Sequence, residues 1–157
     1  MSTRAEQART REQAGVMTHT PHYDELGDIA LLTDSQITER VGALLEKALR
    51  RQVWIMFLDD ASRQLPVLMP SYVPRRPNPA DACRLADFFR ELGDELEAAT
   101  IVVTFERPGQ GTLNDRDRAW LAMLREGCLL AGMSFRGPLL CHSDGVRWVP
   151  LDEYLSA

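Results

Sequence analysis

The sequence predicts an α/β protein built as a single domain, with a mixed central β-sheet flanked by helices. Three observations predict this class. A chain of 157 residues, 45% of them hydrophobic, is long enough to bury one sizeable core. Short apolar runs that suit buried strands alternate with longer segments whose apolar residues recur at helical spacing. Clusters of Pro, Gly, Asp and Asn separate these segments, and no internal repeat is present.

The beginning of the chain predicts a disordered tail (1–22) in front of the folded domain (23–157), because it is polar and lacks a sustained apolar period. His19 and His22 have a spacing that can bind a metal on a helix. Pro21 lies between them and opposes a helix, so a tail without a metal is the preferred interpretation. No apolar segment of the tail suits a secretory signal, which makes the cytoplasm the expected location.

The first part of the domain predicts a helix and a strand pair. Residues 23–32 would add a short helical turn, and an N-cap at 33–35 followed by a helical apolar period predicts a helix over 35–51. The continuous apolar run 53–58 predicts a central strand that is buried on both faces. Residues 64–69 predict an antiparallel partner, which Pro66 and Pro70 confine to an edge or a bulge.

The middle of the domain predicts two helices around a strand. The proline-rich loop 70–79 ends at an N-cap, and a helix follows to about residue 98, although Gly93 is unfavourable within it. β-branched residues predict a strand over 100–105. After the loop 106–113, Asn114 and Asp117 resemble a capping pair, and Gly132 is a suitable helix stop.

The end of the chain predicts a β-hairpin. Residues 134–141 and 146–149 have strand composition and flank Ser143-Asp144-Gly145. An Asp-Gly pair between two strands is a strong hairpin signal. Residues 152–155 predict a closing helical turn.

Charge and cysteine content exclude several function classes. The net charge of −5 and the pI near 5.2 argue against a nucleic-acid binder that neutralises phosphates. No apolar run approaches the roughly 18 residues of a membrane span, so no membrane partner is expected. Cys83, Cys128 and Cys141 are an odd set without CxxC spacing, which argues against a zinc or disulfide framework. Cys83 and Cys128 fall among apolar residues on helix faces and are predicted to be small core side chains.

Three segments carry a resemblance to a known family. They are RQVWIMFLDDASRQL at 51–65, ATIVVTFERPGQGTLNDRD at 99–117 and LLAGMSFRGPLLCHSDGVRWVPL at 129–151. They are similar to the first core hairpin, the strand with its histidine loop and helix start, and the final helix-to-hairpin segment of the RadC-like branch of the JAB/MPN metalloprotease superfamily. The resemblance spans residues 37–154, about three quarters of the chain. It implies a JAB/MPN-like, cytidine-deaminase-like architecture.

The same resemblance shows what this chain lacks. In the family, a His-x-His-Pro segment and an Asp about ten residues later hold zinc, and a Glu on an earlier strand is the general base. Aligned on Pro108, the histidine positions are Phe105, which has no lone pair, and Arg107, which is always cationic. The Asp position falls at Asp117 only with a one-residue gap, and no acidic residue lies between Asp60 and Asp81. We therefore expect Phe105, Arg107 and Asp117 to be vestigial-site positions, with no catalytic residue, no metal ligand and no cofactor.

Arg107 suggests a substitute for the lost metal. It could occupy the vacated position and pair with Asp117 or Asp115, with Arg118 close by, and so stabilise the loop or bind a carboxylate or phosphate. The preferred interpretation, however, is that Glu106, Arg107 and Asp117 are solvated surface charges.

Two other motifs have ordinary structural interpretations. Cys141-His142-Ser143-Asp144 contains nucleophile, base and acid types, but neighbours in an extended chain point to opposite faces, so a hairpin is preferred to a catalytic triad. Gly109-Gln110-Gly111 lacks the full spacing of a phosphate loop, and loop flexibility is preferred.

The function hypothesis is a non-catalytic scaffold or interaction module that contacts a protein partner or forms a homodimer. The favoured contact surfaces are the face of helix 35–51 and the loop 70–79, with Tyr72, Arg75, Arg76 and Trp120 as candidate interface residues. One alternative is a metal-dependent hydrolase or isopeptidase whose relocated site uses some of His142, Cys141, Asp117 and Glu106. Another is an anion or small-molecule sensor that uses Arg107 at a helix N-terminus.

Overall fold

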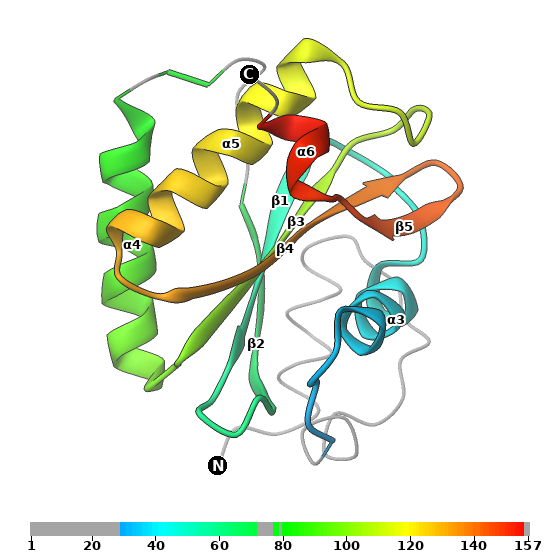
Figure 1. Ribbon diagram of the computed structural model, residues 1–157. Coiled ribbons are helices and arrows are strands. Elements are labelled where there is room, and N and C mark those ends of the chain that lie inside the picture. Colours follow the sequence, from blue (N-terminus) through cyan, green and yellow to red (C-terminus); the bar gives the residue numbers. More distant parts are fainter. Residues whose placement is uncertain (1–28, 72–76, 79, 156–157) are drawn as a thin grey trace.

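Five strands form one mixed sheet in the order β2-β1-β3-β4-β5 (Figure 1). The computed structural model describes residues 29–71, 77–78 and 80–155. The strands are β1 (Gln52–Leu58), β2 (Gln64–Ser71), β3 (Thr100–Glu106), β4 (Ser134–His142) and β5 (Gly145–Trp148). β3 and β4 are parallel, and the other three neighbouring pairs are antiparallel. The predicted α/β class, with a mixed sheet flanked by helices, is confirmed.

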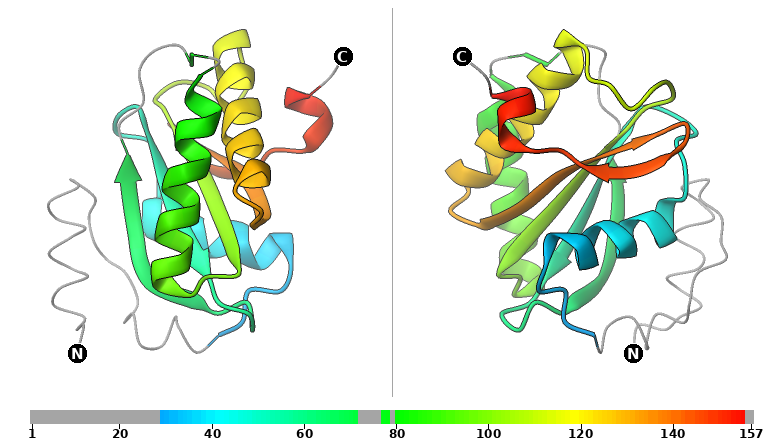
Figure 2. Two further views of the ribbon diagram at one scale, coloured as in Figure 1. Left: turned by 90° about the vertical axis from the view of Figure 1, so that its left-hand side faces the viewer. Right: turned by 45° about the vertical axis from the view of Figure 1, so that its right-hand side comes forward.

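Helices cover both faces of this sheet (Figure 2). The helices are α3 (Asp34–Leu45), α4 (Asp81–Leu96), α5 (Asp115–Leu130) and α6 (Leu151–Tyr154). One apolar cluster joins α3 to side chains such as Trp54 and Met56 on one face of β1. A second cluster joins α4, α5 and α6 to Val53, Ile55 and Phe57 on the other face. β1 is buried along its whole length because both faces are covered, as its uninterrupted apolar run predicted.

The strand pairs follow the turn and proline signals of the sequence. β2 pairs antiparallel with β1 at the edge of the sheet, and the register shifts between Met56 and Leu58, which accommodates Pro66 in an irregular ladder. β4 and β5 form the predicted hairpin around Ser143 and Asp144. α5 crosses over between the parallel strands β3 and β4, so the start of this helix lies beside the end of β3.

Three local predictions are wrong. α3 ends at Leu45, not at residue 51, because Glu46 has a positive φ of 62° and the chain turns back toward the sheet. Residues 29–32, the described part of the predicted turn at 23–32, are not helical; Ala30 forms an isolated bridge with Arg63. Cys83 is exposed on the outer face of α4 and is not a core side chain, whereas Cys128 is buried as predicted.

Among the described residues, no helix is both long and apolar enough to cross a bilayer. The predicted tail at 1–22 lies outside the described residues, together with His19 and His22.

Candidate functional site

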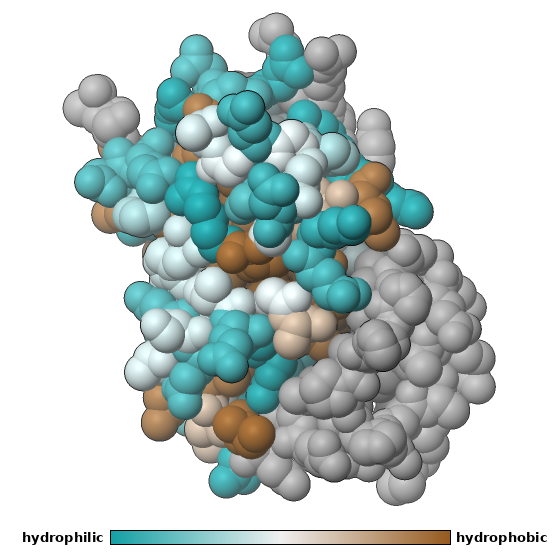
Figure 3. All heavy atoms as spheres, turned by 90° about the vertical axis from the view of Figure 1, so that its right-hand side faces the viewer, coloured by the Kyte–Doolittle hydropathy of each residue, from teal (hydrophilic) through white to brown (hydrophobic). Residues whose placement is uncertain are grey.

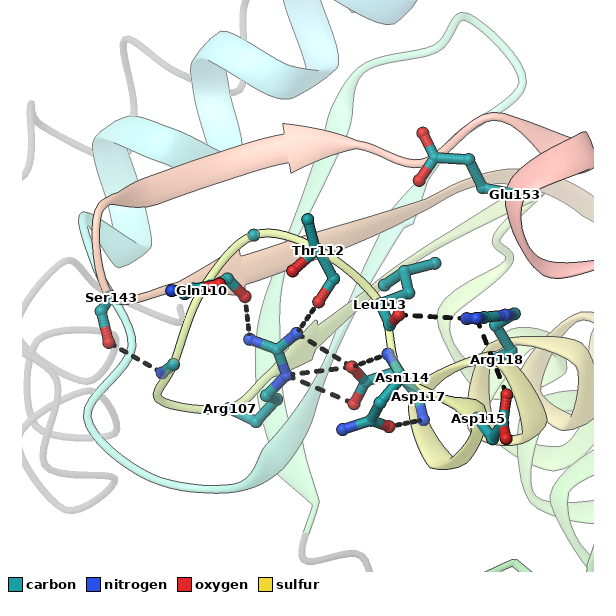
Figure 4. Close-up of polar contacts among 12 residues, drawn as sticks. Arg107, Gln110, Thr112, Leu113, Asn114, Asp115, Asp117, Arg118, Ser143 and Glu153 are labelled. Carbon is teal, nitrogen blue, oxygen red and sulfur yellow. Dashed lines mark hydrogen bonds and ion pairs between the residues drawn. The ribbon is translucent and has the colours of Figure 1, made fainter.

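The end of β3 and the start of α5 are joined by a buried ion pair. Nη2 of Arg107 lies 2.9 Å from Oδ2 of Asp117, and Nε of Arg107 donates to both carboxylate oxygens at 3.2 and 3.3 Å (Figure 4). Both residues are buried, Arg107 at 6% exposure and Asp117 at 0%. The fork of the guanidinium matches the two oxygens of a carboxylate, and this geometry makes such pairs both strong and specific.

The same guanidinium also holds the loop that connects the two elements. Nη1 of Arg107 donates to the carbonyl of Gln110, and Nη2 donates to the carbonyl of Thr112 at 2.8 Å. The guanidinium of Arg107 therefore divides its donors between Asp117 and two carbonyls of its own loop. Gly109 has a φ of +122°, which favours glycine, and its N–H donates to the hydroxyl of Ser143 in the β4–β5 hairpin.

Asp117 also caps the N-terminus of α5 together with Asn114. Its backbone N–H donates to the side chain of Asn114, and its own carboxylate accepts the N–H of Asn114, which completes a capping box. The capping pair expected from the sequence is present. One carboxylate thus satisfies the helix N-terminus and neutralises Arg107.

Phe105 lies on the same face of β3 as Arg107, two residues earlier. Its ring is fully buried in the cluster that includes Trp120 and Leu121 of α5. The guanidinium of Arg51 lies over this ring, 5.6 Å from its centroid. The three positions that the resemblance marks as vestigial therefore face one side of the sheet, where Phe105 fills the core and the other two form the ion pair.

Glu106 points the opposite way and is held by four donors. Its Oε2 accepts the backbone N–H groups of Leu49 and Arg50 at 2.6 and 3.0 Å. Its Oε1 accepts Nε2 of Gln52 at 2.8 Å and the indole N–H of Trp54 at 2.7 Å. This carboxylate, 3% exposed, fastens the segment after α3 to the sheet. From the sequence, Glu106 is expected only as a surface charge or a relocated ligand. The signal for its buried role is a single acid at the end of an apolar strand, in a chain that offers Gln52 and Trp54 as donors.

The interpretation of Glu106, Arg107 and Asp117 as solvated surface charges is wrong, because all three are buried. Arg118 and Asp115 do lie at the surface. Arg118 donates to the carbonyl of Leu113 at 3.0 Å and lies 3.6 Å from Asp115. Asp117, rather than Arg118, faces position 107.

Of the four candidate interface residues, Trp120 is the one that lies in the described part of the chain. Trp120 is 2% exposed and packs in the core between α5 and the sheet, so its prediction as an interface residue is wrong. The helical period of the sequence places an indole on the apolar face, and its size alone was no sign of exposure. Tyr72, Arg75 and Arg76, and most of the loop 70–79, lie outside the described residues.

The proposed relocated metal ligands do not converge. Glu106 and Asp117 lie on opposite faces of the sheet, and each is engaged by other side chains. Within the described parts of the chain, no group of three or more His, Cys, Asp or Glu side chains has an arrangement that could hold a metal ion.

Cys141 and His142 belong to the hairpin, and their side chains diverge. Burial, with a smaller contribution from the Glu106 carboxylate, raises the pKa of the Cys141 thiol to about 12, so it is protonated at neutral pH. Nδ1 of His142 accepts the backbone N–H of Asp144 at 3.3 Å, which closes the turn. The hairpin interpretation of Cys141-His142-Ser143-Asp144 agrees with this geometry.

A scan of protein-family models found no match to this chain, and a search of curated proteins found none either.

Proposed function

We propose that this chain is a non-catalytic, JAB/MPN-like protein that acts as an interaction or scaffold module and forms a homodimer. One observation carries the proposal: the side chains at the positions where the family pattern requires zinc ligands serve the fold instead. Phe105 fills the core, and Arg107 is bonded to Asp117 and to two loop carbonyls. A guanidinium held there by a buried carboxylate opposes the entry of a divalent cation electrostatically.

The sensor alternative based on Arg107 gains no support from this geometry. A ligand anion would have to compete with Asp117, which is buried beside the guanidinium and fully desolvated. The N-terminus of α5 is likewise satisfied by Asn114 and Asp117.

α3 offers the contact surface that we favour. Its inner face is buried on the sheet through Ile37, Val41 and Leu44, while its outer face is polar. Leu32 before the helix and Leu49 after it are 65% and 57% exposed. We take these two exposed aliphatic side chains as the apolar contacts of the proposed interface, because apolar side chains form the buried core of a contact and polar ones its rim.

The test combines metal content with mass. Untagged protein purified without chelators is analysed by plasma mass spectrometry and by sedimentation equilibrium. The proposal expects substoichiometric zinc and a dimer. Near one zinc per chain, together with a peptidase activity that a chelator removes, would overturn it.

The surface is tested separately. Leu32→Asp and Leu49→Asp are expected to shift the sedimentation equilibrium toward monomer. Leu151→Asp is the matched control, because Leu151 is 51% exposed at the other face of the sheet, on α6. Equal weakening by all three variants would argue for a different interface.

A further inference from the structure

Two arginines and a histidine border a shallow depression next to the loop that Arg107 organises. Its volume is about 580 Å³, and it is lined by Gly111, Thr112, Arg118, His142, Arg147 and Glu153. These residues come from the loop, from the first turns of α5, from the β4–β5 hairpin and from α6. Figure 4 shows Arg118, Thr112 and Glu153 around this part of the molecule.

Both guanidiniums are fixed by carbonyls of the same loop. Nη1 of Arg118 donates to Leu113 at 3.0 Å, and Nε of Arg147 donates to Gly111 at 2.9 Å. Each side chain still presents exposed surface, 36% for Arg118 and 30% for Arg147. Their attachment points are two residues apart in the chain, so two oriented cations border one small space.

His142 adds a third donor. Because its Nδ1 accepts the N–H of Asp144, the neutral ring carries its proton on Nε2. Nε2 lies beside Gly111, where a Cβ would be only 3.1 Å away. The absence of a side chain at position 111 therefore lets the imidazole pack closely against the loop, at the edge of the depression.

The acidic side chains around the depression are more exposed to solvent than the arginines with which they pair. Glu153 forms a bidentate pair with Arg147 at 2.8 and 3.2 Å, and both side chains are partly exposed. Asp115 is fully exposed and lies 3.6 Å from Arg118, so solvent screens that pair. The lining thus holds two permanent positive charges against the one negative charge of Glu153, in a chain whose net charge is −5.

Figure 3 shows the side of the molecule that carries this loop and hairpin; hydrophilic surface predominates among its described residues, with hydrophobic patches between them. The loop itself is held from beneath by the buried pair of Arg107 with Asp117. Two oriented guanidiniums and an imidazole at the border of a depression, on a loop held in this way, have the chemistry of an anion site.

We propose that this depression binds a small molecule through a phosphate or carboxylate group, which Arg118, Arg147 and Nε2 of His142 contact. The bound oxyanion displaces Glu153 from Arg147, since both compete for the same guanidinium. The site does not use Arg107 and does not depend on the non-catalytic or dimeric character proposed above.

The test uses inorganic phosphate and malonate as probes, titrated into the full-length protein at constant ionic strength. Amide and arginine Nε chemical shifts report binding. Arg118→Gln is expected to lower the affinity for the more tightly bound of the two anions about tenfold or more, because it removes one charge-assisted hydrogen bond. Glu153→Gln is expected to raise the affinity for the same anion by about two- to fivefold, because it removes an exposed carboxylate that competes for Arg147.

Arg84→Gln is the matched control. Arg84 pairs with Asp81 in the first turn of α4 at three-residue spacing, as Arg118 does with Asp115 in α5, and its side chain is 81% exposed. This variant is expected to leave both anion affinities unchanged. The probe that binds more tightly shows whether the natural ligand carries a phosphate or a carboxylate group. No saturable shift at Gly111 and Arg118 with either probe, equal effects of Arg84→Gln and Arg118→Gln, or weaker binding in Glu153→Gln would overturn the proposal.

Discussion

Glu106 and Arg107 are neighbours in sequence, yet their side chains are buried on opposite faces of the sheet by different helices. Glu106 accepts hydrogen bonds from Trp54 and from the segment after α3, whereas Arg107 pairs with Asp117 at the start of α5. The end of β3 therefore fastens both helical layers through two adjacent charges. Because both charges are desolvated, removing the hydrogen-bond partners of either one should lower the free energy of unfolding considerably.

Removal of Arg107 should destabilise the fold strongly. Arg107→Ala leaves the Asp117 carboxylate buried with only Asn114 as a donor, and we expect a loss of about 3–5 kcal/mol in the free energy of unfolding. Urea denaturation measures it. Arg84→Ala, which breaks an exposed pair, should change stability by less than about 0.5 kcal/mol. The double variant Arg107→Met, Asp117→Leu should recover part of the loss, and strictly additive effects would show that the two residues are not coupled.

Replacement of Glu106 by Gln should release the segment after α3. An amide keeps one acceptor but presents an NH₂ group to donors, so we expect a loss of about 2–3 kcal/mol. Hydrogen exchange should accelerate at the Leu49 and Arg50 amides, which donate to this carboxylate. Glu46→Gln, an exposed change nearby, is the control. Unchanged exchange at both amides would contradict the role assigned to Glu106.

Stability should fall in alkaline solution because of two buried thiols. Burial raises the pKa of Cys128, and burial together with Glu106 raises that of Cys141 to about 12, from an ordinary value of 9.0. The unfolded chain ionises first, so this stabilising contribution is complete below pH 9.0 and is lost as the pH rises toward 12. Each thiol should lower the free energy of unfolding by about 1.4 kcal/mol per pH unit in that window.

Urea midpoints on both sides of pH 9 measure this slope. The variant Cys128→Ala, Cys141→Ala should have a shallower one, and Cys83→Ala, which alters an exposed thiol, should not. Burial also raises the pKa of Tyr154, which is present in every variant, so a residual slope is expected.

Two helical glycines should respond to alanine with opposite signs. A Cβ at Gly127 in α5 would lie 2.8 Å from Cβ of Leu85 in α4, so Gly127→Ala should force the helices apart at a cost of about 1–3 kcal/mol. A Cβ at Gly42 in α3 meets nothing closer than 4.0 Å, and Gly42→Ala should stabilise by up to about 1 kcal/mol. Thermal unfolding of the two variants decides; stabilisation by both would show that α4 and α5 can separate freely.

The sequence predicted those parts of the fold whose signals are local. The apolar run of β1, the prolines of β2, the capping pair at Asn114 and Asp117 and the Asp-Gly turn each identified an element in its correct place. The end of α3 was missed because Leu49 continues a helical period, although its side chain is exposed. Glu106, 57 residues away from Leu49, holds the backbone that follows the helix, and no local pattern reports such a contact.

The site was predicted only in part, for a related reason. Position 107 was recognised as an arginine where the family pattern has a ligand, and Asp117 or Asp115 were named as its partners. Sequence spacing could not choose between burial and solvation, because charged residues are usually exposed. Gly93 is a similar case: a Cβ there would lie 2.7 Å from the sulfur of Met133, so a residue that is unfavourable for a helix leaves room for a side chain 40 residues away.

The pairing of Arg107 with Asp117 also constrains how this chain can diverge. If only one of the two residues is replaced, the other remains as a buried charge without its counter-charge. Replacing the pair by two successive single substitutions therefore passes through an unstable intermediate. In an alignment of relatives, these two positions should therefore change together, while Glu106 should change together with Gln52 and Trp54 as a second, independent set. The two sets lie on opposite faces of one strand, so we expect substitutions in one set to be independent of those in the other.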